Sequence, residues 1–239
     1  MSASTVEKVA NAVLYEGYVL YPYRASSKKN RERFTFGRVY PEAYSLDQNG
    51  AEPCVMQAEC LVRRMGDRAT LRARIRFLQP MAREIGAAPG ADETGFACVP
   101  ELRVGDRLYT TWHEAVEREI ASSELPITEP IRSASLFSFP KSLTVEPIYD
   151  DEHRLFGSIR RRLDALSGQI EYRIEAIDAE VCKFTARIAN RTPVTLSEMR
   201  DPNALLLRTF ASTHAILEAH GAEFLSMTDP PPRYANAAE

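Results

Sequence analysis

This chain of 239 residues contains four histidines and four cysteines. Their side chains are the ones best suited to acid–base, metal or nucleophilic chemistry. A metal site needs ligands at short, fixed spacings, such as residues i and i+4 of a helix. His214 and His220 are six residues apart, which on a helix places them roughly 240° out of phase. His113 and His153 are distant from both in the sequence. The spacing therefore predicts no metal site, and we expect no resident cofactor.

The cysteines are too few and too dispersed for a disulfide-built scaffold, although their even number leaves a secreted protein open. On one strand, Cys54 and Cys60 would lie about 20 Å apart, too far to chelate one ion. A nucleophilic cysteine needs an electropositive or histidine partner, and the sequence places none next to these residues. We therefore expect Cys54, Cys60 and Cys182 to be buried and unpaired thiols.

Motifs of familiar enzyme classes, namely GxSxG, the P-loop, GxGxxG and HExxH, do not occur in the sequence. Catalytic groups assembled from distant positions leave no such motif, so an unrecognised enzyme or a small-ligand-binding protein is the alternative to a non-catalytic protein. The net charge of −3 provides no overall attraction to nucleic acid. No run approaches the roughly 18 apolar residues that span a bilayer, and the first residues lack signal-peptide character. We expect a cytoplasmic protein that binds no nucleic acid.

A basic loop reverses the charge of this net-acidic chain locally, and tyrosines flank it. Such a field can steer an acidic protein partner, and tyrosine and arginine are enriched at protein interfaces. A second basic feature is an arginine stripe on one face of a predicted strand. The alternative is that both sets are simply solvated, since charged faces discourage aggregation of edge strands. The candidate partner-binding residues are Tyr18, Tyr21, Tyr23, Arg24, Lys28, Lys29, Arg31, Arg33, Arg72, Arg74 and Arg76.

The elements that must position these residues read mainly as strands. A β-branched and aromatic run predicts a strand over 12–21, and Phe34, Phe36 and Tyr40 alternate on one face of a second. Alternation over 54–65 and 71–77, around a turn at 65–67, suggests an antiparallel hairpin whose arginines face water. The clearest hairpin joins the alternating runs that begin at Ile170 and Cys182.

Helical signals are fewer. Thr111 and Glu114 have the spacing of a capping box, and apolar residues recurring every four positions predict a helix over 112–122. Asp201 and Pro202 resemble an N-cap followed by proline at the first helical position, so a last helix is expected to end near Gly221. Gly105-Asp106 suits a tight turn, and 126–147 is expected to hold short extended pieces.

Composition agrees with a globular, mainly β protein. The apolar fraction of 44% and the charged fraction of 26% are ordinary for a folded domain, and fifteen prolines disfavour long helices. The sequence therefore predicts a mainly β, α+β fold with antiparallel sheets in a sandwich- or barrel-like core and two or three helices. We expect one domain over 1–239, or two lobes with a boundary near 86–95, and a loose tail over 229–239.

Two segments carry a family resemblance: VLYEGYVLYPYRASSKKNRERFTFGRVYP near the N-terminus and STHAILEAHGAEFLSMTDPPP near the C-terminus. The sequence between them, which includes LYTTWHEAVEREI, is similar only in the order of its elements. With them the chain resembles uncharacterised accessory proteins encoded beside nickel–iron (NiFe) hydrogenase genes. The resemblance carries no catalytic residue over. It implies a protein that assists assembly, maturation or stabilisation of a hydrogenase by docking on a subunit or maturation factor, and it leaves a homo-oligomer open.

Overall fold

The computed structural model describes residues 3–15, 34–88 and 96–238. Its strands form antiparallel sheets, which confirms the predicted mainly β, α+β fold. Five α-helices lie among the described residues rather than the two or three expected. Four of the five contain six residues or fewer, which is too short for a helical repeat of apolar residues to show in the sequence.

The first sheet has five strands in the order β14-β1-β12-β11-β8. Its strands are β1 (Val55–Arg64), β8 (Ile131–Phe139), β11 (Leu166–Ala176), β12 (Val181–Asn190) and β14 (Ala222–Leu225). β11 and β12 pair in register from Gly168 opposite Asn190 to Ala176 opposite Cys182, so the clearest hairpin of the sequence is confirmed. The strict alternation of apolar and polar residues places one face of each strand against the core.

The second sheet is built on one long strand, β2 (Thr70–Ala87). β2 pairs directly with β13, β10, β6, β7 and β3, and β9 pairs with β10. These strands are β3 (Ala97–Val99), β6 (Trp112–Ala121), β7 (Leu125–Pro126), β9 (Ser142–Tyr149), β10 (Leu155–Leu163) and β13 (Ala211–His220). A separate hairpin joins β4 (Glu101–Val104) to β5 (Arg107–Thr110) at the expected Gly105-Asp106 turn, where Gly105 has a positive φ of 57°.

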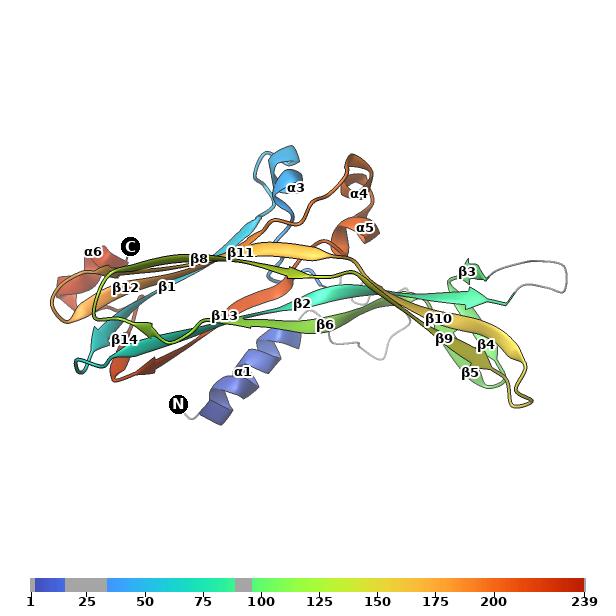
Figure 1. The fold of residues 1–239 in the computed structure, drawn as a ribbon, viewed down its shortest axis with the longest axis horizontal. Helices are drawn as coiled ribbons and strands as arrows, with labels where there is room; N and C mark the ends of the chain where they lie inside the picture. Colours follow the sequence, from blue (N-terminus) through green and yellow to red (C-terminus); the bar gives the residue numbers. More distant parts are fainter. Residues whose placement is uncertain (1–2, 16–33, 89–95, 239) are drawn as a thin grey trace.

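The main core lies between the two sheets. Apolar residues of β2, among them Leu71, Ile75 and Phe77, meet residues such as Ile170 and Phe184 of the facing sheet. The far half of β2 leaves this sandwich and, with β3, β9, β10 and the β4–β5 hairpin, forms an arm at one end of the elongated molecule (Figure 1). A smaller cluster that includes Ile85 and Ile159 stabilises the arm. The suggested boundary near 86–95 thus begins at the far end of β2.

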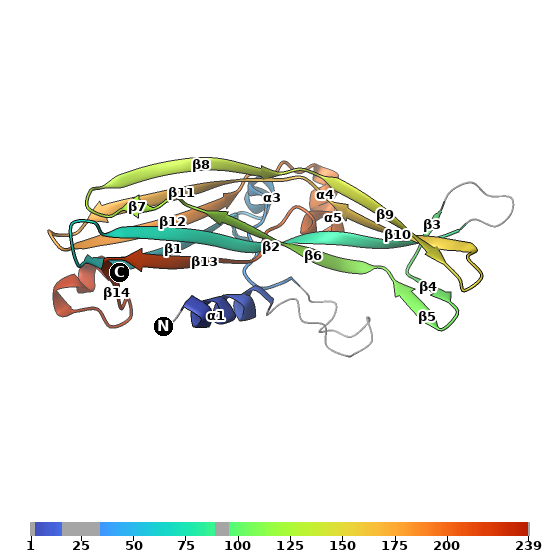
Figure 2. The ribbon, with the colours of Figure 1, turned by 60° about the horizontal axis from the view of Figure 1, so that its bottom comes forward.

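The helices lie on the outside of the two-sheet sandwich and are not part of its layers. α1 lies along the outer face of the second sheet, and the short helices α3, α4 and α5 project from the opposite side of the molecule (Figures 1 and 2). Asp201 caps α5 by accepting a hydrogen bond from the main-chain N–H of Asn203, as the sequence predicts. The helices are α1 (Ala3–Tyr15), α3 (Glu42–Asp47), α4 (Leu196–Arg200), α5 (Pro202–Leu206), the 3-10 turn η1 (Pro232–Tyr234) and α6 (Ala235–Ala238).

The strand predicted over 12–21 is wrong for its described part, since residues 12–15 form the last turn of α1. Ala10 and Leu14 are buried, and Glu7 and Asn11 reach Arg76; these pairs lie four residues apart on one side of the helix. Residues 16–21 lie outside the described part of the chain. The helical repeat prevailed because it buries Leu14 against the sheet.

The second predicted strand, over 34–40, is also wrong. Phe34 is buried with a positive φ of 61°, whereas Phe36 is 44% exposed, so the two do not share a buried face. The segment forms one isolated bridge, between Val39 and Phe210, and its Phe36 and Gly37 carbonyls accept hydrogen bonds from the main-chain N–H groups of Ser212 and Thr213, but it belongs to no named strand.

The predicted hairpin of 54–65 with 71–77 is wrong in its pairing, although both strands exist. β1 pairs with β12 and β14, and β2 belongs to the other sheet. Cys60 and Val62 face the core from one side and Leu71 and Ala73 from the other. Because both strands bury their apolar faces in the same core, the turn at 65–69 arches between the sheets instead of closing a hairpin.

The predicted helix over 112–122 is strand β6. It pairs with β2 from Trp112 opposite Arg83 to Ala121 opposite Arg74. Glu119 lies opposite Arg76 and ion-pairs with both Arg74 and Arg76. These cross-strand charge pairs and the free edge of β2 outweigh the helical propensity of the segment.

The predicted helix over 201–221 ends at Leu206, and 211–220 form strand β13. β13 pairs with β2 and contains a register shift between Ala211 and His214. Gly221 has the expected positive φ, at 62°, but it connects β13 to β14 instead of ending a helix. The signals for a helix start and a left-handed glycine were correct, and the element between them was not.

The predicted loose tail over 229–239 is docked over its last described residues. Tyr234 is only 2% exposed and packs with Leu61 and Val181, while its hydroxyl donates a hydrogen bond to Asp178 at 2.8 Å. One buried aromatic side chain thus fixes a segment whose composition is typical of a loose extension.

Candidate functional site

The arginine stripe of β2 does not face water as expected. Arg76 is buried, with its side chain 7% exposed, and Arg74 is half-buried; only Arg72 is exposed. Glu7 of α1 ion-pairs with both Arg74 and Arg76, at 3.2 and 2.9 Å. Glu117, Glu119 and Glu218 supply further pairs. The stripe therefore binds the protein's own N-terminal helix and neighbouring strands, which leaves Arg72 as its exposed member.

The basic loop with its tyrosines lies outside the described residues. Tyr18, Tyr21, Tyr23, Arg24, Lys28, Lys29, Arg31 and Arg33 all fall within 16–33. The structure thus assigns no position to these predicted docking residues, and the interpretation of the loop as a docking surface remains a prediction.

The cysteines are all free thiols, as expected, but their burial differs. Cys60 and Cys182 are buried, and burial, followed by the neighbouring Cys182, raises the pKa of Cys60 to about 12. Cys54 is only partly buried, contrary to the prediction, because it precedes β1. Cys98 is exposed on the short strand β3. Burial disfavours the thiolate, so neither buried cysteine is suited to nucleophilic work.

We expect a thiol reagent such as DTNB to label Cys98 rapidly in the native protein and Cys54 more slowly. Cys60 and Cys182 should react only on unfolding, at least about 100-fold more slowly than Cys98, because a raised pKa and burial both reduce attack by thiolate. Labelling kinetics at 412 nm measure this directly. Cys98→Ser should abolish the fast phase, and rapid reaction of more than two thiols would contradict the burial.

The histidines do not converge. His214 is half-buried on β13, where its Nδ1 lies 2.8 Å from the Ser212 carbonyl oxygen, and burial lowers its pKa. His220 is exposed at the end of the same strand. Within residues 3–15, 34–88 and 96–238, no three potential metal ligands cluster together.

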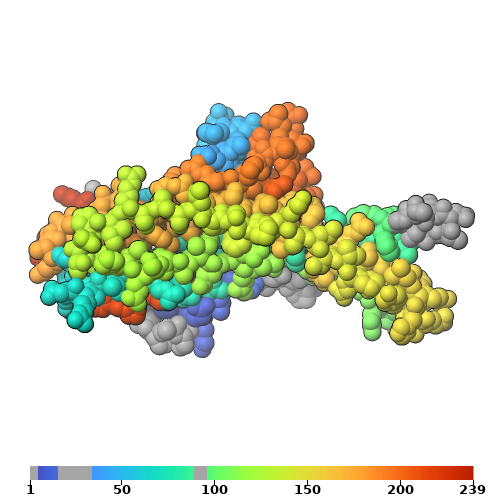
Figure 3. Space-filling view, viewed as in Figure 1, coloured from blue at the N-terminus to red at the C-terminus, as the bar shows by residue number. Residues whose placement is uncertain are grey.

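The open edge of β8 is the surface that sequence reasoning missed. Within the described residues, β8 pairs with β11 alone, in continuous register from Ile131 opposite Ile174 to Phe139 opposite Leu166. Its nine residues, IRSASLFSF, contain one charge, Arg132, and neither proline nor a bulge. Leu136 is 80% exposed. Figure 3 shows the band of yellow-green residues that includes β8 lying uncovered along the surface.

Neighbouring edges are protected, which makes β8 distinctive. Natural sheets discourage edge-to-edge pairing with charged residues, prolines and bulges. The edge strand β6 carries Glu114, Glu117, Arg118 and Glu119, and the edge strand β9 carries Glu146 and Pro147. β8 has none of these devices beyond Arg132, so the main-chain groups on its side away from β11 have no strand partner in the part of the chain that the structure describes.

The last residues of β8 also form one wall of a cavity of about 590 Å³. The start of β11 and the segment that leads into α4 complete it. Its walls are mostly apolar, and Arg208, Glu198 and Thr195 supply polar groups at one side. The lining comprises Ser138, Phe139, Pro140, Ala165, Leu166, Ser167, Pro193, Val194, Thr195, Glu198 and Arg208.

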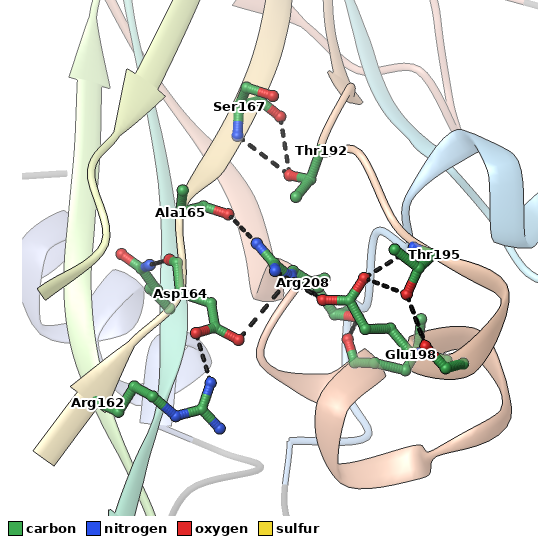
Figure 4. A network of polar contacts seen from close by, with 12 residues as sticks. Arg162, Asp164, Ala165, Ser167, Thr192, Thr195, Glu198 and Arg208 are labelled. Atoms are coloured by element: carbon green, nitrogen blue, oxygen red, sulfur yellow. Dashed lines mark hydrogen bonds and ion pairs between the residues drawn. The ribbon is translucent and has the colours of Figure 1, made fainter. Parts of the chain in front are cut away.

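Arg208 is held by its surroundings on several sides, as Figure 4 shows. Its Nε and Nη2 donate to Glu198 Oε1 at 3.1 and 2.6 Å, and its Nη1 donates to the Ala165 carbonyl at 3.1 Å. Asp164 Oδ2 lies 3.8 Å from Nε, and the other oxygen of Asp164 accepts from Arg162. The two arginines and two carboxylates balance, so the site has no net charge.

Glu198 also closes the helix cap of α4. Its carboxylate accepts hydrogen bonds from the main-chain N–H and the hydroxyl of Thr195, at 2.7 and 2.9 Å, while its own N–H donates to that hydroxyl. The Thr195 main-chain N–H, followed by Arg208, lowers the pKa of Glu198. The carboxylate therefore stays ionised near neutral pH and keeps Arg208 neutralised.

Signals for this site in the sequence were weak. The uncharged run SASLFSF over 133–139 was visible, but a run of this kind is equally typical of a fully paired central strand. The cavity is lined from separate segments near 138–140, 165–167, 193–198 and 208, which no local pattern connects.

No protein-family model matches the chain, and no curated protein is significantly similar to it in sequence.

Among the described helices α1 is the longest, with 13 residues, and none has the length and apolar character of a membrane-spanning segment.

Proposed function

We propose that this protein is a non-catalytic accessory protein that docks an extended segment of a partner protein as an added strand on β8. The observation that carries the proposal is the long, nearly uncharged edge of β8, with Leu136 exposed beside it. Strand addition gains affinity from main-chain hydrogen bonds along an open edge. The side chains of β8 add apolar cross-strand contacts for the incoming strand.

The identity of the partner rests on the sequence resemblance. A nickel–iron hydrogenase subunit or maturation factor is the proposed partner, and docking would assist assembly, maturation or stabilisation of that enzyme. The edge of β8 supports a docking function of this kind without selecting the partner.

The test is to place charge on the β8 edge. The double variant Ala134→Lys with Leu136→Lys adds two lysines to the outward face of β8, and edge lysines oppose pairing with another strand. We expect at least about tenfold less partner captured from a lysate of the native host, which corresponds to about 1.4 kcal/mol. Quantitative mass spectrometry of the captured proteins measures this and shows whether a hydrogenase component is among those lost.

A matched control is Leu46→Lys with Ala51→Lys, which adds the same charges at exposed positions on and beside α3. Both double variants should melt within a few degrees of the natural protein, since exposed substitutions change stability little. Equal capture by the two double variants would contradict docking on β8.

A further inference from the structure

The cavity beside Arg208 adjoins the end of β8. Ser138 and Phe139 are the last two residues of that strand, and with Pro140 they form one wall of the cavity. A segment that pairs along β8 and continues past Phe139 would therefore run beside this wall of the cavity. In strand addition, main-chain hydrogen bonds give affinity and pockets for individual side chains give specificity.

The charges of the cavity show which chemistry it accepts. Arg208 is engaged by Glu198 and by the Ala165 carbonyl, and Asp164 balances Arg162. An incoming carboxylate or ammonium group would have to enter a mostly apolar cavity without an unpaired counter-charge, which is costly. An apolar side chain needs no such partner. It would pack on Phe139, Leu166 and Val194 instead.

The open edge of β8 also favours an apolar side chain as the occupant of the cavity. β8 carries a single charge in nine residues, so it provides no electrostatic selection for a charged segment. The cavity volume of about 590 Å³ leaves room for a large side chain, within the range of ordinary ligand sites.

We infer that the cavity is an anchor pocket for a large, uncharged apolar side chain of the segment that adds to β8. This inference rests on the proposed function and gives it a specificity: the partner segment is extended, nearly uncharged along β8, and carries an aromatic or long aliphatic residue where it passes the end of the strand.

A displayed library of random ten-residue peptides, selected on the immobilised full chain, tests the inference. Dissociation constants of the selected peptides are then measured by fluorescence anisotropy on three variants. Val194→Trp fills the cavity, Val9→Trp adds the same side chain at an exposed position of α1, and Ala134→Lys with Leu136→Lys blocks the edge. Selected peptides should share one large apolar residue.

Val194→Trp should raise the dissociation constants of these peptides at least tenfold. Replacing their shared residue with alanine should cause a similar loss of affinity for the natural protein. The two changes should not add, because each removes the same contact. Val9→Trp should change nothing. A photo-crosslinking residue at the shared position should attach to Phe139, Leu166 or Val194, which localises the anchor even if Val194→Trp fails to fold.

The outcomes separate the two proposals. Peptides that depend on the β8 edge but share no apolar residue, or that bind Val194→Trp normally, would overturn the anchor pocket and leave strand addition standing. Selected peptides that bind the β8 double variant as tightly as the natural protein would overturn both strand addition and the anchor pocket. Selection that yields no binding peptide would also overturn both. A natural protein that elutes as a dimer, and as a monomer once β8 carries the two lysines, would assign the edge to a second copy and overturn the peptide assignment.

Discussion

Replacing Phe77 with alanine is expected to lower the free energy of unfolding by about 3–5 kcal/mol, the usual cost of removing a buried aromatic side chain. Phe77 is fully buried on β2 and stacks on Phe210 with ring centroids 4.5 Å apart. Its ring centroid also lies 6.3 and 6.1 Å from those of Phe137 and Phe139, the residues that hold β8 onto the core. Urea unfolding followed by circular dichroism measures the change.

Phe224→Ala is the matched control for Phe77→Ala, since Phe224 is 44% exposed on β14. Its cost should stay below about 1 kcal/mol. Similar losses for both variants would show that the aromatic cluster around Phe77 does not dominate the stability of the sandwich.

The second large effect is expected at Asn190, a fully buried polar residue at the end of β12. Its Nδ2 donates to the carbonyls of Val39 and Arg208, at 2.9 and 2.8 Å, and its Oδ1 accepts from the Thr192 N–H at 2.9 Å. Leucine has a similar size but leaves these main-chain groups without that partner. Asn190→Leu should therefore cost about 2–4 kcal/mol, although the Val39 carbonyl keeps its bond from Phe210.

Melting temperature and urea unfolding measure this second effect. Asn203→Leu, at an exposed position of α5, is the control and is expected to stay within about 0.5 kcal/mol. Because Asn190 fixes the main chain of Arg208, Asn190→Leu should also weaken binding of peptides that use the cavity. An unchanged melting temperature would mean that the orphaned main-chain groups find other partners.

The position of β8 links these stability arguments to the proposed function. Phe137 and Phe139 turn inward to the aromatic cluster, and the Arg118 guanidinium of β6 lies 4.4 Å from the centroid of the Phe139 ring. The inward residues anchor the strand, while its outward residues, such as Leu136, stay exposed. An edge fixed in this way presents its main-chain groups without first having to order itself, which lowers the entropic cost of pairing.

Local sequence determined the features that depend on neighbours a few residues away. The strict alternation in 166–176 and 181–190 specified a hairpin, because one residue of slip would expose every apolar side chain. Asp201 and Gly105 specified a helix cap and a tight turn through their own hydrogen bonding and backbone freedom. The sequence also placed Cys60 and Cys182 on the core side of their strands.

Tertiary structure decided everything that depends on which strand lies alongside. Segments 112–121 and 211–220 have helical signals, yet both pair along β2, which lies opposite ten residues of the first segment and eight of the second. The sequence predicted that the arginines of β2 face water, whereas in the structure carboxylates of α1 and β6 pair with Arg74 and Arg76. Above all, only the completed sheet shows that β8 ends it. An uncharged strand reads the same in the sequence whether it has one neighbour or two, since pairing is a long-range contact that local propensity does not encode.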